Sequence, residues 1–543
     1  MNNEVMDSRT TQLTKLQRLD LWANQFSDRL NPILIKETRQ SLKSRQFIFT
    51  FFSLLTAALG WTIVGSLSRM PQIYTTPSAP TLLLGYYAVL AVPMLLVVPL
   101  AAYRSLEVEI DDGTLELLSI SSLSPWQVVL GKLASSLLQI FLYFIVLLPC
   151  MAYAYTLRGV NLTSILLITT TLLASGIFLT IVSVFFASLT HTRSGRTLTL
   201  LGTVIILLAS VAGISLAISS LILDGNLLSP NELFFSIASC LPIGSCAGHL
   251  MLTATAIRLT PDSENRSTPL RRSVLALSTS IIFASALATL LLSARVTRTT
   301  IFSQPDFLYG LMLAGGTLWT IAGSMFVSES PNLTPRVKRD LPSSIFHRSF
   351  STWLTPGPAT GFFFVCINAF LMVAWFGFGL KWLAARNLSV DEFAIVSKRL
   401  SWAFELSSVF AAYLVITLIF VRYLVRFIRK KQNPRIEIGI AALIATTIML
   451  ALIPYSIGLH LNEFRTYAYS NWQMSNWIWT LSWIYQGNDP GSVPFLVKLI
   501  AILILVISLI RNRKVTRPTR TATPQRVLDE KQKNRPNHAG ELD

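Results

Sequence analysis

The sequence predicts an all-α integral membrane protein, a polytopic helix bundle of about 12 transmembrane helices. Composition is the first reason: the 543-residue chain is 52% hydrophobic and only 13% charged, whereas soluble domains average about 25% charged residues. The second reason is that apolar runs of about 20 residues, the length needed to cross a bilayer core of about 30 Å, recur along the whole chain. No soluble fold class accommodates so many such runs.

The first 45 residues are expected to form a cytoplasmic N-terminus. They are polar and charged, so we expect no cleavable signal peptide, and the first span would serve as the insertion signal. Within 26–45, the apolar residues Ile33 and Leu34 alternate with the charged residues Lys36 and Glu37 at helical spacing. This pattern predicts an amphipathic helix that lies in the inner membrane interface.

Twelve apolar runs follow, and the sixth is the weakest. Pro242 and Gly244 interrupt it, so a re-entrant segment is an alternative to a span. The predicted spans are 46–68, 81–103, 133–156, 163–190, 198–223, 234–257, 274–294, 306–328, 358–380, 400–424, 437–459 and 493–510.

Charge favours twelve crossings. With twelve spans and the N-terminus inside, most of the 45 Lys and Arg residues lie in cytoplasmic segments, as the positive-inside bias requires. If 234–257 did not cross, the basic run from Arg422 to Arg435 would lie outside. We therefore predict that both termini are cytoplasmic, and that the net charge of +18 reflects topology and not nucleic-acid binding.

A charged stretch interrupts the apolar pattern at 104–132. Its four carboxylates Glu107, Glu109, Asp111 and Asp112 precede an apolar helical run, where the partial positive charge of a helix N-terminus favours anions. We therefore predict a short helix with an acidic N-terminus.

A second helix is predicted to follow within this stretch and to continue into the third span. Ser124, Pro125 and Gln127 suit its N-cap, N1 and N3 positions, because Ser and Gln can satisfy each other's end donors and Pro has no donor.

This stretch resembles the loop after the second span of ABC-2 type transporter permeases. The matching residues are Glu109, Gly113, Thr114, Leu115, Glu116, Leu117, Gly131 and Lys132. Two departures occur: Ile110 stands where a basic residue is common, and Ser119 to Leu123 replace a usual Thr-Pro. The pattern Asn31-Pro32, Lys36-Glu37 and Arg39 is also similar to the elbow helix that precedes the first span in that family. The resemblance covers about 1–258.

The resemblance implies a function and a division of the chain. In that family the loop is a coupling helix that docks on a separate ATPase subunit, so the chain would be the membrane subunit of an ABC transporter, most often an exporter. The parts would be 1–45 with the elbow helix, a six-span unit at 46–258 with the coupling loop 104–132, a six-span C-terminal extension at 259–510, and a basic cytoplasmic tail at 511–543. The residues that would contact the ATPase are Glu107, Glu109, Asp111, Asp112, Gly113, Thr114 and Glu116.

The partners implied are an ABC ATPase subunit, a second permease chain in a homodimer or heterodimer, and membrane lipid. ATP would be bound by the partner, since this sequence has no Gly-rich phosphate loop that ends in Lys and Ser or Thr, and no cofactor is expected in this chain. The four cysteines show no metal-ligand spacing. The resemblance also implies a bacterial inner membrane, and the sequence does not identify the substrate.

Two other functions remain open. A polytopic membrane enzyme, such as a lipid-linked glycosyltransferase, would need acidic residues in an outer loop soon after the first span, and the loop 69–80 has none. The other is a non-transporting, ABC-linked component of envelope assembly. The aromatic stretch 464–485 is interpreted as a belt in the outer membrane interface, with a sugar- or lipid-stacking site as its alternative.

Overall fold

The computed structural model consists of helices and short helical turns, and no strand occurs among the residues it describes. Those residues are 31–113, 123–157, 159–190, 192–223, 230–261, 264–293, 305–331, 335–339, 352–387, 390–429, 438–464 and 469–512. Twelve helices in this part of the chain are long and apolar enough to cross a membrane. The prediction of an all-α, multi-pass membrane protein is therefore confirmed.

The chain divides into two compact units, the first comprising Met1–Leu227 and Met251–Thr260 and the second Leu228–Leu250 and Pro261–Asp543. Helix α10 contributes to both units, its first part to the second unit and its part from Met251 to the first. The helices of the first unit are α2 (Pro32–Leu42), α3 (Arg45–Leu67), α4 (Ala79–Val92), α5 (Val98–Asp111), α7 (Pro125–Thr156), α8 (Leu162–Ala187), α9 (Arg193–Leu223) and the end of α10 (Pro230–Leu259).

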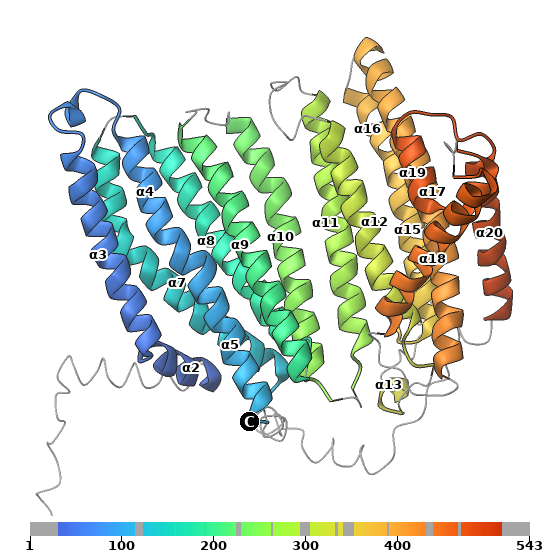
Figure 1. Cartoon of the computed structure of the whole chain (residues 1–543), viewed down its shortest axis with the longest axis horizontal. Coiled ribbons are helices and arrows are strands. Elements are labelled where there is room, and N and C mark those ends of the chain that lie inside the picture. The colour runs from blue at the N-terminus through green and yellow to red at the C-terminus, as the bar shows by residue number, and fades with distance from the viewer. Residues whose placement is uncertain are drawn as a thin grey trace, which may run out of the picture. The chain divides into compact units, whose positions relative to one another are not determined.

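The long helices of the first unit run side by side, and α2 lies across one end of them (Figure 1). A π-helical turn, η2 (Pro93–Val97), joins α4 to α5 so that Ala79–Asp111 forms one span. Tyr86, Leu90 and Met94 are fully enclosed on this span, which therefore forms the centre of the first unit's core.

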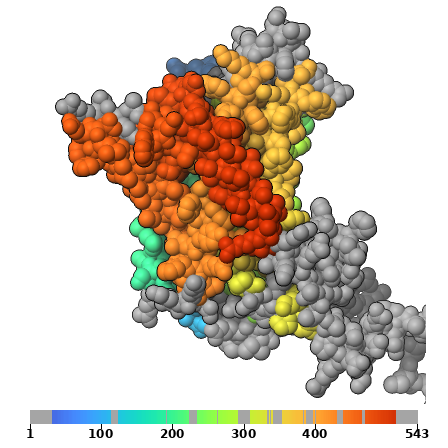
Figure 2. All heavy atoms as spheres, turned by 90° about the vertical axis from the view of Figure 1, so that its right-hand side faces the viewer, coloured from blue at the N-terminus to red at the C-terminus, as the bar shows by residue number. Residues whose placement is uncertain are grey.

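The second unit contains α11 (Ser267–Ser293), α12 (Pro305–Val327), α13 (Pro335–Arg339), η4 (Thr352–Leu354), α15 (Pro358–Ala374), η5 (Trp375–Gly379), α16 (Leu380–Asn387), α17 (Val390–Arg429), α18 (Ile438–Leu461), η6 (Asn471–Ser475), α19 (Trp477–Tyr485) and α20 (Val493–Arg511). Its core is built around α15 and α17, with Phe362, Val365 and Leu418 almost fully enclosed. Figure 2 shows a face of this unit where α20, in red, lies against α17, in orange.

Two of the local predictions concern the sixth span and the aromatic stretch. Helix α10 continues from Pro230 to Leu259 through Pro242 and Gly244, so the structure shows one unbroken helix and not a re-entrant segment. In the aromatic stretch, η6 and α19 pack beside α17 and α18, and the rings of Tyr469 and Trp483 stack with centroids 5.3 Å apart.

Candidate functional site

The charged stretch lies where α5 ends and α7 begins. Helix α7 starts with the predicted capping box: the Ser124 hydroxyl accepts from the Gln127 N–H, the Gln127 side chain accepts from the Ser124 N–H, and Pro125 stands at N1. The residues between, 114–122, lie outside the described part of the chain. The predicted site residues Thr114 and Glu116 are among them.

The four carboxylates lie at the end of helix α5. Glu107, Glu109 and Asp111 belong to the last turns of α5, and Asp112 is its C-cap. The helix that they were expected to precede would begin within 114–122, outside the described residues. At the end of α5 itself, the partial charge of the helix terminus is negative and does not favour them. Basic side chains from other helices pair with two of them, Glu109 and Asp111.

Lys132 supplies the central positive charge of this end of the unit. Its ammonium nitrogen Nζ lies 3.1 Å from Glu37 Oε1 and 3.0 Å from Glu109 Oε2. It also donates to the Ser105 hydroxyl at 2.8 Å. It donates more weakly to the Ser105 carbonyl oxygen at 3.3 Å. The Lys132 side chain is only 3% exposed, so Glu37 and Ser105 accept its hydrogen bonds, and Glu109 adds a second negative charge, in a nearly dry environment.

Lys36 completes the cluster at its outer edge. Its Nζ lies 3.3 Å from Glu109 Oε1, and its side chain is 61% exposed. The cluster of Lys36, Glu37, Glu109 and Lys132 thus contains two positive and two negative charges. The Ser105 hydroxyl donates to Glu37 Oε2 at 3.1 Å, which connects α2 to α5 a second time, beside the Lys36–Glu109 pair.

Helix α2 is fitted closely to the start of α7. Asn31 caps α2 by accepting from the Ile33 N–H at 3.0 Å, and its amide nitrogen donates to the Gln127 carbonyl oxygen at 2.5 Å. A methyl group added to Gly131 would lie 2.8 Å from Ile33 Cγ2. The absence of a side chain at Gly131 therefore lets α2 approach α7 and brings Glu37 within reach of Lys132.

A second ion pair connects α5 with α9. The Asp111 carboxylate pairs with the Arg196 guanidinium. One turn further along α9, the Thr199 hydroxyl lies 2.9 Å from the hydroxyl of Tyr103 on α5. Helix α9 is thereby held at the same end of α5 as α2 and α7.

Gly113 ends helix α5. Its φ is +65°, a left-handed conformation that glycine adopts without the strain a side chain would cause, and it occupies the position just after the C-cap. An added Cβ there would meet nothing within 4 Å, so backbone conformation and not crowding favours glycine. Asp111, Asp112 and Gly113 are all exposed.

The structure thus brings some predicted site residues together and leaves others apart. Glu109 and Asp111 take part in ion pairs, while Asp112 is exposed beside them. Sequence reasoning noted Glu37 and Lys132 in separate motifs but missed that they pair, and it missed Arg196. One signal was available: a Lys in the first turns of an apolar helix needs an anionic partner if it is buried.

The second unit holds another buried ion pair, which the sequence did not reveal. Arg271 of α11 donates to Glu329 Oε2 at 2.7 Å and to the carbonyl oxygens of Trp353 and Thr355 at 2.7 and 2.6 Å. Burial raises the pKa of the Glu329 carboxyl, although the charge of Arg271 opposes this shift. Because Arg271 is completely enclosed and bonded largely to backbone, the pair joins α11 to the segment before α15 and leaves no opening for a ligand.

No group of three or more His, Cys, Asp or Glu side chains that could hold a metal ion was found in the described ranges. Comparisons with models of known protein families, with curated proteins and with solved structures found no match.

Proposed function

We propose that this chain is the membrane-spanning permease subunit of an ATP-driven ABC transporter, an exporter that takes its energy from a separate ATPase subunit. One observation carries the proposal. Glu37 belongs to the segment that resembles an elbow helix, and Glu109 and Lys132 belong to the segment that resembles a coupling loop. These three residues, from two separately recognised patterns, meet in one buried cluster.

The cluster gives the loop a mechanical role that suits such a subunit. Residues 114–122 join α5 to α7, and the ends of these helices are tied to each other and to α2 through Lys132. A partner that moves the loop would therefore move three helices together. In this proposal Asp112 and Gly113 present the exposed start of the loop to the ATPase, and the half-buried Glu107 lies near it in the last turns of α5. The loop and both termini face the cytoplasm.

The proposal also requires a second permease chain, because the sequence contains only one acidic Gly-Thr-Leu-Glu loop. The second unit then forms the six-span extension that the minimal family lacks. The membrane would be the inner membrane of a bacterium, and the tail beyond Arg511 would attract anionic lipid.

The test is a pull-down of the full chain, solubilised from its native membrane, followed by mass spectrometry. Wild type is compared with the double variant Gly113→Pro plus Glu116→Lys, because proline cannot adopt the positive φ of Gly113. Gly491→Pro is the matched control: Gly491 also has a positive φ, +62°, with nothing within 4 Å of an added Cβ, but it lies between α19 and α20.

Recovery of an ATP-binding-cassette protein with wild type and with the Gly491→Pro chain, but not with the double variant, would support the class and the docking loop together. If well-folded wild-type chain brings down no ATPase, the permease proposal is wrong, and a membrane enzyme becomes the leading alternative. A stable ATPase complex that shows no substrate flux would instead favour the envelope-assembly component.

A further inference from the structure

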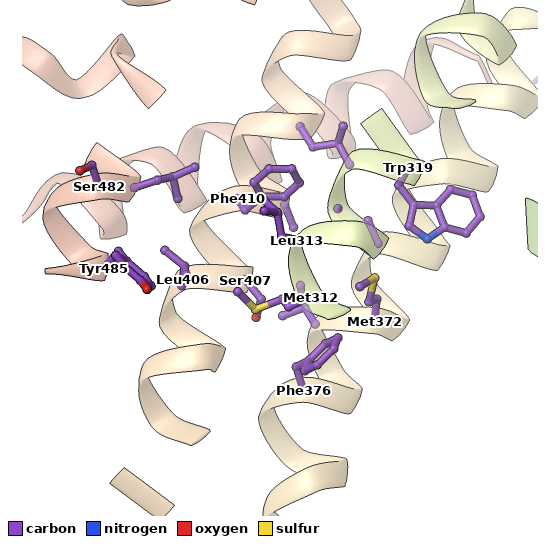
Figure 3. A pocket seen from close by; sticks show the side chains of 16 residues that line it. Met312, Leu313, Trp319, Met372, Phe376, Leu406, Ser407, Phe410, Ser482 and Tyr485 are labelled. Carbon is purple, nitrogen blue, oxygen red and sulfur yellow. The ribbon is translucent and has the colours of Figure 1, made fainter. Parts of the chain in front are cut away.

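The second unit contains an apolar cavity of about 350 Å³. Figure 3 shows how its walls are arranged: Met312 and Leu313 come from α12, Met372 from α15, and Phe410 from α17. Tyr485 of α19 stands at one side. The volume is roughly twice that of a cavity known to bind benzene, which is about 150 Å³, and it falls within the range of about 300–1,000 Å³ found for ligand pockets.

The lining leaves little for water to bind. None of the 16 lining residues is charged. The indole N–H of Trp319 donates to the Ser278 hydroxyl at 3.1 Å, and the Ser407 hydroxyl donates to the Phe404 carbonyl oxygen at 3.0 Å. Because a buried water needs about two to four polar partners, the interior of this cavity favours an apolar occupant.

The cavity lies at the level of the hydrocarbon chains of a bilayer. The lining residues of α12 span 312–319, which are the middle turns of a helix that runs from Pro305 to Val327. The ends of this helix are therefore more than a full helical turn away on either side. Leu313 at the cavity is 61% exposed and Tyr485 57% exposed, so the cavity opens on the surface of the second unit, where lipid chains are the solvent.

The walls combine a fixed frame with adaptable side chains. Phe376 belongs to η5, a five-residue π-helix, and such turns are frequent at functional sites. A Cβ on Gly377 would lie 2.1 Å from Phe404 Cδ2, so α17 packs directly on the backbone of this turn and holds it in place. Met312 and Met372 are unbranched and flexible, which lets them fit chains of differing shape.

We propose that this cavity binds one hydrocarbon chain of a membrane lipid. Lipid is as apolar as the lining, so transfer from the bilayer gains nothing from the hydrophobic effect. The gain comes from dispersion contacts that the walls lack while the space is empty. The exposed Ser482 and Tyr485 of α19 stand at the mouth, where they offer hydroxyl groups to the more polar part of the same lipid.

The test uses the full chain in nanodiscs that contain phosphatidylcholine with a diazirine in one acyl chain. After illumination, mass spectrometry locates the labelled peptides. We expect labelling to concentrate on the cavity-lining parts of α12, α15 and α17. In Ala411→Phe the ring occupies the cavity, and labelling there should fall about tenfold, which corresponds to ~1.4 kcal/mol of lost binding.

The matched control is Ala374→Phe. Ala374 lies on α15, is partly buried like Ala411, and does not line the cavity, so its replacement should leave the labelling unchanged. If Ala411→Phe does not fold, Val373→Phe fills the cavity from α15 instead of α17 and should give the same loss. Labelling spread evenly over exposed helices, and unchanged by the filling variants, would overturn the proposal. The proposal would also be wrong if a benzene derivative that bears a diazirine labelled the cavity while the lipid probe did not.

Discussion

Replacing Lys132 with methionine tests the buried cluster that joins α2, α5 and α7. The change keeps most of the side-chain volume but removes the charge. It leaves the carboxylates of Glu37 and Glu109, whose side chains are only 9% and 13% exposed, without their shared ammonium group. Removing one partner of a buried ion pair costs about 3–5 kcal/mol, because the other charge remains buried and uncompensated. We expect the lower value, roughly 3 kcal/mol, since Lys36 still contacts Glu109.

This loss of free energy translates into a measurable change in Tm. The first unit comprises Met1–Leu227 and Met251–Thr260. At about 2.1 cal/mol/K per residue, its unfolding entropy is about 0.5 kcal/mol/K, so a loss of about 3 kcal/mol lowers Tm by about 6 °C. The assay is thermal unfolding of the purified full chain in detergent, followed through the fluorescence of its 12 tryptophans.

Lys36→Met is the matched control, because Lys36 contacts the same Glu109 but is 61% exposed. Exposed ion pairs contribute about 0–1 kcal/mol, so this variant should lose less than about 2 °C. Adding Glu37→Gln to Lys132→Met should recover part of the lost stability, since one buried charge is then removed. The reasoning fails if Lys132→Met and Lys36→Met lower Tm equally, or if the added Glu37→Gln lowers Tm further.

Three further predictions concern other parts of the chain. Arg271→Met should destabilise the second unit by roughly 3 kcal/mol or more, and adding Glu329→Gln should restore part of it; equal Tm values for the single and double variants would contradict this. Gly131→Ala should lower Tm because its Cβ meets Ile33. Gly60→Ala, whose Cβ meets nothing within 4 Å, should instead add about 0.5–1 kcal/mol of stability. A change of Tm in the same direction for both variants would exclude the contact with α2. Epitope tags at the two ends of the chain should both resist protease added to intact cells, and cleavage of either would refute the predicted topology.

The long apolar helices could be predicted from the sequence because length and hydropathy suffice to identify them. The first span was expected at 46–68 and occurs at Arg45–Leu67. The start of α7 was predicted from three residues, because an N-cap is a local interaction between neighbours in the chain. Hydropathy alone is less informative about where a helix ends, which is why the acidic residues before Gly113 were not assigned to the last turns of α5.

The cluster itself could not be predicted by the same means. Lys132 and Glu37 are 95 positions apart, and no local pattern states which of several carboxylates a buried Lys will meet. The end of α5 was within reach, however. Asp112-Gly113 has the form of a helix stop, with glycine just after the C-cap, and using it would have placed Glu107 and Glu109 in the last turns of α5.

The placement of these carboxylates at the end of α5 also explains why the cluster takes its residues from three helices. Carboxylates near a helix C-terminus are disfavoured by the helix dipole, and no basic residue stands in the last turn of α5 to offset them. Lys132 of α7 and Lys36 of α2 supply the missing charge. The local arrangement of α5 is therefore stable only with α2 and α7 in place, and a displacement that separated them would expose buried charges. Under the proposed function, this interdependence is what would make a push on residues 114–122 move the helices as a group.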